Sequence, residues 1–485
     1  MKIMKNFMYN IAYQILVMII PLITMPYISR IIGATGYGIY SYHYSIACYF
    51  GLFSLLGITN YGVRTIATCF DDKDKRTTNF FNIYIIQFIA SLLVILCYLG
   101  YVCFFVTQNQ DVAYLQVIYL ISVIFDINWF YFGMELFSLT VVWNIVVKIL
   151  STVSIFVFVK KPSDVTIYTI IMLGGMLLSQ LGLWAALPRY IHFEKPSFAK
   201  IKIHLGPVFL LFLPAIATSV FRTMDKVMLG VFCNKAQVGF CTQAENLEWT
   251  CLSVITALGT VMIPVASKLS DTGKRETLSH YTQLSFRGIT IFTIAITAVL
   301  IGISPVFVPF FLGEEFVPTI YLTMLISPSM FFIAWENIIR THYLLPNHKD
   351  REFTLSVFSG AIINFFANLV LIPHLQSYGT AIGTLLAEGT VLIIQAYIAR
   401  HDISILSILK SCLYYFFAGT VMCLVMLLLG RLQMQVICKL ALQLLAGGSI
   451  FLLLTIPYLI FRDKELYHTL LSLLPKCIQR HFHKE

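Results

Sequence analysis

Charged residues are scarce in this chain of 485 residues, of which only 12% are Asp, Glu, Lys or Arg. Soluble domains carry about 25%. Hydrophobic residues make up 58% of the chain, and its mean hydropathy is +0.82. Such a composition has too little polar surface to cover a folded core in water. The shortage of charge therefore excludes a soluble globular protein.

The apolar residues form long runs, and residues 80–106 contain no charged side chain at all. About 20 apolar residues suffice for a helix that crosses the bilayer. The first run follows Lys2 and Lys5 and is too long for a cleaved signal peptide, so we interpret it as a retained span. We predict an all-α integral membrane protein with about 14 spans, at 8–29, 39–59, 80–105, 112–132, 140–159, 165–187, 206–232, 245–267, 284–308, 319–345, 353–373, 378–399, 408–430 and 437–461.

The distribution of Lys and Arg predicts the orientation, because short cytoplasmic loops are enriched in both. With the N-terminus inside, 23 of the 33 Lys and Arg residues fall in inner segments and six in outer ones. Both termini are then cytoplasmic, and the net charge of +10 faces an anionic leaflet. The basic balance therefore needs no nucleic-acid partner.

Motifs for catalysis and metal binding are missing. The sequence contains neither H-E-x-x-H nor G-x-x-x-x-G-K-[ST], the patterns of zinc proteases and P-loop ATPases. The predicted loops leave no room for a soluble catalytic domain, so we expect no enzyme and no cofactor. The eleven cysteines are scattered; only Cys233 and Cys241, beside a predicted outer loop, are candidates for a disulfide. We interpret the glycine-rich residues 33–38 as a turn.

Charged side chains inside the spans are costly, and they often mark substrate or ion pathways. A simpler interpretation is also open, since Arg222 with Asp225 and Glu336 with Arg340 have the spacing of intrahelical pairs. The basic excess favours an anionic substrate, and phosphate suits arginine especially. The candidates to bind it are Arg30, Arg222, Lys226, Arg64 and Lys148. Candidates to couple an ion are Asp126, Asp225 and Glu388.

The two halves of the chain echo each other weakly at an offset close to 200 residues. Pro21 and Pro214, Gly38 and Gly239, and Gly57 and Gly259 occupy corresponding places. Many transporters consist of such repeats, with the substrate path between them. We predict six-helix lobes at 1–205 and 206–400, an extra helix pair at 401–461 and a basic cytoplasmic tail at 462–485, with a short interfacial helix near 466–474.

Several strings resemble one known family. These are residues 21–33 (PLITMPYISRIIG), 36–40 (GYGIY), 126–137 (DINWFYFGMELF), 224–230 (MDKVMLG) and 379–388 (GTAIGTLLAE). Together they are similar, in the same order, to Wzx-type polysaccharide flippases of the multidrug/oligosaccharidyl-lipid/polysaccharide exporter superfamily. The likeness runs from about residue 6 to 400.

The resemblance implies two lobes around an alternating central cavity. It also implies transfer of a polyprenyl-pyrophosphate-linked oligosaccharide from the cytoplasmic to the outer leaflet of the bacterial inner membrane, driven by a proton or sodium gradient. The product would be O-antigen, capsule or exopolysaccharide, and a polymerase and assembly proteins are candidate partners. Tyr27, Tyr40 and Trp129 are candidates to stack on sugars.

Three alternatives stay open at this point. A drug or cation exporter of the same superfamily would need an acidic cavity. A membrane polysaccharide polymerase or glycosyltransferase would need a long outer loop or an acidic catalytic motif. A flippase for peptidoglycan precursors differs only in its cargo.

Overall fold

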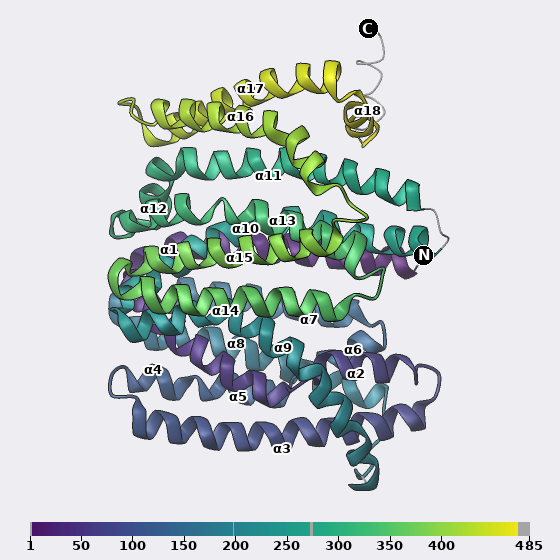
Figure 1. Ribbon diagram of the computed structural model, residues 1–485. Helices are drawn as coiled ribbons and strands as arrows, with labels where there is room; N and C mark the ends of the chain where they lie inside the picture. Colours follow the sequence, from purple (N-terminus) through teal and green to yellow (C-terminus); the bar gives the residue numbers. More distant parts are fainter. Residues whose placement is uncertain (1, 197, 272–274, 474–485) are drawn as a thin grey trace. The chain divides into compact units, whose positions relative to one another are not determined.

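In the computed structural model, residues 2–196, 198–271 and 275–473 are described, and their regular elements are helices (Figure 1). This confirms the predicted all-α fold class. Short 3-10 or π turns occupy Pro162–Asp164, Leu187–Arg189, Glu314–Phe316 and Arg340–Leu344. The α-helices are α1 (Lys2–Leu55), α2 (Ile58–Ala67), α3 (Lys73–Phe105), α4 (Gln110–Leu115), α5 (Val117–Ile124), α6 (Asn128–Gly133), α7 (Phe137–Phe158), α8 (Val165–Ala186), α9 (Phe198–Phe232), α10 (Lys235–Asp271), α11 (Arg275–Leu312), α12 (Val317–Ile326), α13 (Ser329–Ile339), α14 (Asp350–Leu375), α15 (Ser377–Ala399), α16 (Ile405–Leu429), α17 (Val436–Arg462) and α18 (Lys464–Leu473).

Ten helices in the described part of the chain are long and apolar enough to cross a membrane, and an eleventh is a pair bent by 43° at residues 327–328. Large apolar side chains on these helices are exposed, among them Leu93 (59%), Leu96 (66%) and Phe104 (81%). In water such a surface would aggregate, whereas lipid tails cover it. The protein is therefore a multi-pass membrane protein. The count of 14 spans stays a prediction, because many side chains of α9 and α10 lie outside the described set.

Helix α1 bends at Gly33, whose φ of 68° lies in the left-handed region that glycine tolerates best. The interpretation of residues 33–38 as a turn was wrong, since the helix resumes after this one residue. Gly38 also has a packing role. A Cβ there would lie 1.7 Å from the carbonyl oxygen of Lys235, so α1 and the start of α10 approach as closely as two backbones can.

Contacts divide the chain into two compact units, which are described separately. Unit 1 comprises residues 1–242 and 368–380, and its core surrounds Trp129 on α6. The Trp129 ring stacks on Phe80 of α3, with ring centroids 5.4 Å apart. Gly62 of α2 lies against the same ring, because a Cβ there would come within 2.5 Å of it. Asp72 caps α3 by accepting a 3.0 Å hydrogen bond from the Lys75 backbone N–H.

Unit 2 comprises residues 243–367 and 381–485, and it is built around α11, α16 and α17, which lie side by side (Figure 1). Trp335 of α13 packs edge-on against Phe286 of α11 and donates a 2.9 Å hydrogen bond to the Thr290 hydroxyl. Helix α18 follows α17 and packs against the N-terminal part of α11, near His280 and Gly288. The predicted short helix near residues 466–474 therefore exists, whereas residues 474–485, including His481 and His483, lie outside the described residues.

Two further predictions concern cysteines and lobes. Cys233 and Cys241 are free thiols, so the suggested disulfide was wrong. The Cys241 sulfur lies 3.3 Å from the Thr380 hydroxyl instead. The chain passes between the two units within α10, α14 and α15. The predicted lobes at 1–205 and 206–400 stay a prediction about the transport architecture.

Candidate functional site

One apolar span of unit 1 is broken between α5 and α6, at residues 125–127. A break inside an apolar span frees carbonyl groups that lipid cannot satisfy. Here the Gln87 amide of α3 donates to the carbonyl oxygens of Val123 (2.8 Å) and Asp126 (2.9 Å). The Trp184 indole of α8 donates to the Phe125 carbonyl oxygen at 2.9 Å. Side chains from two neighbouring helices thus stabilise the break by hydrogen-bonding to its carbonyl groups.

The Asp126 carboxylate lies in this break and belongs to a cluster of planar polar groups. Its Oδ1 accepts hydrogen bonds from the backbone N–H of Asn128 (3.0 Å) and from the Asn128 amide (2.8 Å). The same amide donates to Oε1 of Gln180 on α8 at 3.1 Å. All three side chains are half-buried. Trp129, by contrast, is fully buried and donates to Gln87, so its ring belongs to the core.

A second carboxylate of unit 1, Asp225 on α9, is buried with 6% of its surface exposed. Asn368 of α14 donates a 2.6 Å hydrogen bond to its Oδ1. Tyr49 of α1 lies close enough to Asp225 for the two to interact electrostatically. The candidate coupling residue is therefore hydrogen-bonded to α14 and lies near α1.

Unit 2 gathers carboxyl groups from α10, α13 and α15. Glu388 is buried, and its side chain is hydrogen-bonded to that of Glu336. Glu248 is buried nearby, where it is held by the Ser329 hydroxyl and feels the charge of Glu388. Arg340 is the nearby cation that attracts Glu336.

The five basic residues predicted to bind an anion all belong to unit 1 and lie on four helices, with Arg222 and Lys226 both on α9. Arg30 on α1 and Arg64 on α2 are exposed, whereas Lys148 on α7 and Lys226 on α9 are half-buried. Lys226 interacts with Cys48 of α1, which is about 27 Å along that helix from Arg30. The structure therefore separates these two. Arg222 belongs to α9, but its side chain lies outside those described.

Sequence patterns did not single out the amide side chains. Gln87, Gln180 and Asn368 lie in apolar runs and bind the break, the Asp126 cluster and Asp225, respectively. An amide within a membrane span would have been a usable signal, since an unpaired polar group is costly there. For the predicted pair of Glu336 and Arg340, the Arg340 guanidinium donates to Asn337 at 2.9 Å, while Glu336 bonds to Glu388.

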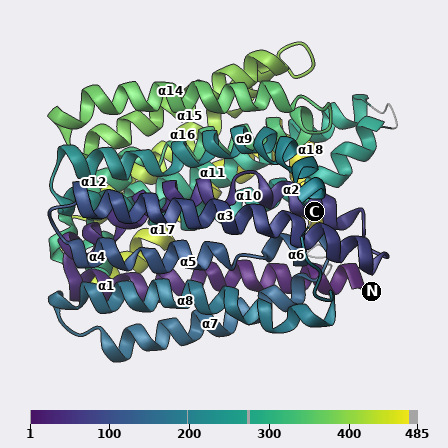
Figure 2. The same cartoon turned by 90° about the horizontal axis from the view of Figure 1, so that it is seen from below.

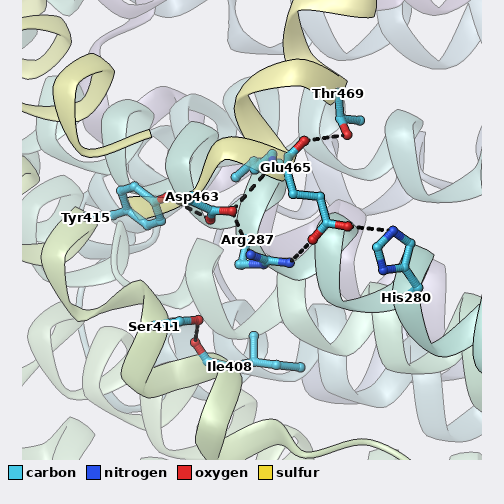
Figure 3. A network of polar contacts seen from close by, with 9 residues as sticks. His280, Arg287, Ile408, Ser411, Tyr415, Asp463, Glu465 and Thr469 are labelled. Carbon is cyan, nitrogen blue, oxygen red and sulfur yellow. Dashed lines mark hydrogen bonds and ion pairs between the residues drawn. The ribbon is translucent and has the colours of Figure 1, made fainter. Parts of the chain in front are cut away.

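A third polar cluster lies where α17 meets α18 (Figure 3). Arg287 of α11 forms ion pairs with Asp463 (2.7 Å) and Glu465 (3.2 Å). Tyr415 of α16 donates to Asp463 at 3.3 Å, and His280 lies 2.7 Å from Glu465. Four helices thus meet at one ion-pair network, which fixes the start of α18.

These features define a class of protein. Its spans carry buried carboxylates and a supported helix break, as expected for a membrane transporter with a polar path. Among the described residues, no group of three His, Cys, Asp or Glu side chains is placed to hold a metal ion.

Comparison with known proteins gives the family. Residues 3–270 match the family described as polysaccharide biosynthesis protein, so the chain belongs to that family. A "Putative O-antigen transporter" of Escherichia coli (strain K12) is 20% identical over 414 residues, 83% of this chain and 98% of that protein. A protein of the same description from Shigella dysenteriae is 24% identical over 380 residues, 76% of this chain and 92% of its own. These relatives are transporters and not enzymes.

Two solved structures share the fold. The lipid II flippase MurJ, in an inward closed conformation, has a TM-score of 0.73 at 15% identity, with 95% of this chain and 99% of MurJ covered. An inward-facing multidrug resistance MATE family transporter of the MOP superfamily has a TM-score of 0.54 at 16% identity, with 80% and 99% covered. The predicted family resemblance is confirmed by the match over residues 3–270, and these two structures show the shared fold.

Proposed function

We propose that this protein flips a polyprenyl-pyrophosphate-linked oligosaccharide from the cytoplasmic to the outer leaflet of the bacterial inner membrane, for assembly of a surface polysaccharide. The observation that carries the proposal is the likeness to two O-antigen transporters over 98% and 92% of their lengths. The cargo's charged and hydroxylated head cannot cross hydrocarbon unaided. Supported polar groups inside the spans, such as the Asp126 cluster, fit that need.

For the pyrophosphate, we propose the basic residues Arg30, Arg222, Lys226, Arg64 and Lys148. Arginine and lysine attract phosphate oxygens, and the attraction is stronger away from water. Arg222→Ala is expected to abolish flipping while the amount of inserted protein stays unchanged. A loss of protein would support the structural pairing of Arg222 with Asp225 instead. Lys161→Ala, at an exposed site, is the matched control.

For the energy source, we propose coupling to a proton or sodium gradient through Asp225 or Glu388. Both carboxylates are buried, and both contact polar side chains of another helix. Loss or gain of a cation there would change the packing of those helices and bias alternating access. Glu388→Gln is expected to stop gradient-driven flipping but to preserve cargo binding, whereas Glu314→Gln at an exposed site should be neutral.

Leaflet accessibility of the lipid-linked oligosaccharide is the decisive test. Membrane vesicles with and without the protein are treated with an impermeant sugar-modifying reagent on the outer face. Labelling that requires the protein supports a flippase. Unchanged labelling, with altered length or amount of the lipid-linked sugar, would refute transport.

A drug or cation exporter is the second candidate. The carboxyl groups of Glu248, Glu336 and Glu388 in unit 2 favour it, because acidic groups suit a cationic substrate. Export of a fluorescent organic cation from vesicles, lost in Glu388→Gln, would support this alternative if no lipid-linked sugar is flipped.

A further inference from the structure

A row of aromatic rings in unit 1 leads to planar polar groups; Tyr40 and Tyr168 are buried in the core, and Tyr44 and Tyr119 are half-buried. The rings are Tyr168, Tyr40, Tyr44 and Tyr119, here called the tyrosine ladder. Tyr40 packs edge-on against Tyr168 (5.0 Å between centroids) and stacks on Tyr44 (5.6 Å). Tyr44 in turn meets Tyr119 edge-on at 5.3 Å. The ladder thus joins α8, α1 and α5, which lie side by side (Figure 2).

The ladder leads to the polar triad of Asp126, Asn128 and Gln180. Tyr119 interacts electrostatically with Asp126. On α8, Gln180 is one turn beyond Met176, whose sulfur is the 3.9 Å partner of the Tyr44 hydroxyl. A thioether sulfur is a weak hydrogen-bond acceptor. The Tyr44 hydroxyl would therefore form a stronger hydrogen bond to an oxygen of a bound ligand than to the Met176 sulfur. The aromatic and polar parts therefore form one continuous strip.

The strip faces away from the lipid side of α8. Tyr168, Met176 and Gln180 follow one another at multiples of four residues and lie along one side of the helix. The exposed apolar residues of α8 are on the opposite side: Ile167, Ile170, Leu178 and Leu181. The polar and aromatic side chains are thus directed into the protein.

The triad's atoms match the needs of a hydroxylated ligand. Both described bonds to the Asp126 carboxylate go to Oδ1. The Asn128 side-chain oxygen is buried with no hydrogen-bond partner in the described structure. The Gln180 side-chain oxygen accepts a hydrogen bond from the Asn128 amide, while the Gln180 NH₂ group can donate. A sugar hydroxyl both donates and accepts, and the apolar C–H face of a pyranose suits an aromatic ring.

We infer that this strip is the glycan-binding wall of unit 1, with the triad binding sugar hydroxyls and Tyr44 and Tyr119 packing on sugar rings. The inference rests on the proposed function and deepens it, because it names the part of the cargo that this unit recognises. Asp126, which the sequence suggested as an ion-coupling group, is assigned here to the sugar. Hydrogen bonding to hydroxyls selects strongly against a ligand that lacks them.

The test compares two lipids on the detergent-solubilised full chain by native mass spectrometry. One is the polyprenyl-pyrophosphate-linked oligosaccharide extracted from the host, and the other is polyprenyl pyrophosphate without sugar. The unmodified protein is expected to prefer the glycosylated lipid. Gln180→Ala and Asp126→Asn should each reduce this preference by roughly five- to tenfold through the loss of one hydrogen bond, with binding of the sugarless lipid unchanged.

Controls separate folding from recognition. Leu178→Ala, on the lipid side of α8, should leave the preference intact, and Tyr44→Phe should retain more of it than Tyr44→Ala. Equal loss of both lipids, or an unchanged preference in both triad variants, overturns the inference. So does an Asp126→Asn protein that loses only its ion dependence. If the unmodified protein binds both lipids equally, the glycan-binding inference is refuted but the proposed function is not. If it binds neither lipid, both the inference and the proposed function are refuted.

Discussion

The ion-pair network at Arg287 makes a quantitative prediction about α18. The Arg287 side chain is 18% exposed, and that of its partner Asp463 is 8% exposed (Figure 3). Removing one member of a buried pair costs about 3–5 kcal/mol, because the other charge stays buried. Asp463 keeps bonds from the Tyr415 hydroxyl and the Leu466 backbone N–H. We therefore expect Arg287→Ala to weaken the attachment of α18 by about 2–4 kcal/mol.

Thiol labelling can measure this effect. Leu466 of α18 is 2% exposed, so a cysteine introduced there reacts only when α18 detaches. A loss of about 2–4 kcal/mol corresponds to labelling that is roughly 30- to 1,000-fold faster. Glu465 is 45% exposed, so Glu465→Gln should change the rate by less than about fivefold. Acceleration below about threefold in Arg287→Ala would refute the argument, and the exposed Arg351→Ala is the control.

Two predictions concern the core of unit 1. Gly62→Ala would push a methyl group into the buried Trp129 ring and should destabilise the protein by about 1–3 kcal/mol, which lowers its melting temperature in detergent. In the control Gly100→Ala, the new methyl group meets no atom within 4 Å, so the melting temperature should not fall. Gln87→Leu should cost about 3 kcal/mol, since it removes the amide's hydrogen bonds with the carbonyl groups of the break and with the Trp129 indole. A melting temperature unchanged by Gln87→Leu would mean that water or relaxation replaces the amide.

The sequence was sufficient to predict the helices but not their irregular points. Long apolar runs and the scarcity of charge lead directly to spans, because the bilayer admits few other structures. An interruption near Gly33 was expected as a turn, but the break at Asp126 was not predicted, since it depends on side chains far away in the sequence. Gln87 precedes the break by about 40 residues and Gln180 follows it by more than 50. Pairings over such distances are set by helix packing, which hydropathy does not encode.

The candidate site was predicted in part. The carboxylates were found because a charge in an apolar run stands out, and Asp225 and Glu388 are buried as a functional group would be. The basic residues were grouped by charge alone, and the structure spreads them over several helices. Charge identifies which residues are unusual in a span. Charge does not show which of these residues share a surface. That depends on which faces of the helices pack against one another.

A span is broken in each unit, and the two breaks support the repeat suggested by the sequence. Unit 1 breaks at residues 125–127, beside Asp126, and unit 2 breaks at residues 327–328, just before Ser329, which binds Glu248. The two breaks are about 200 residues apart, the same offset as that between Gly57 and Gly259. Apolar sequence alone matches easily by chance, but an interruption of a membrane helix is costly and is kept only where side chains support it. A shared interruption at the shared offset is therefore stronger evidence for a duplicated unit than the matching glycines. The two breaks differ in their surroundings, since one carries a carboxylate among amides and the other lies beside a cluster of carboxyl groups.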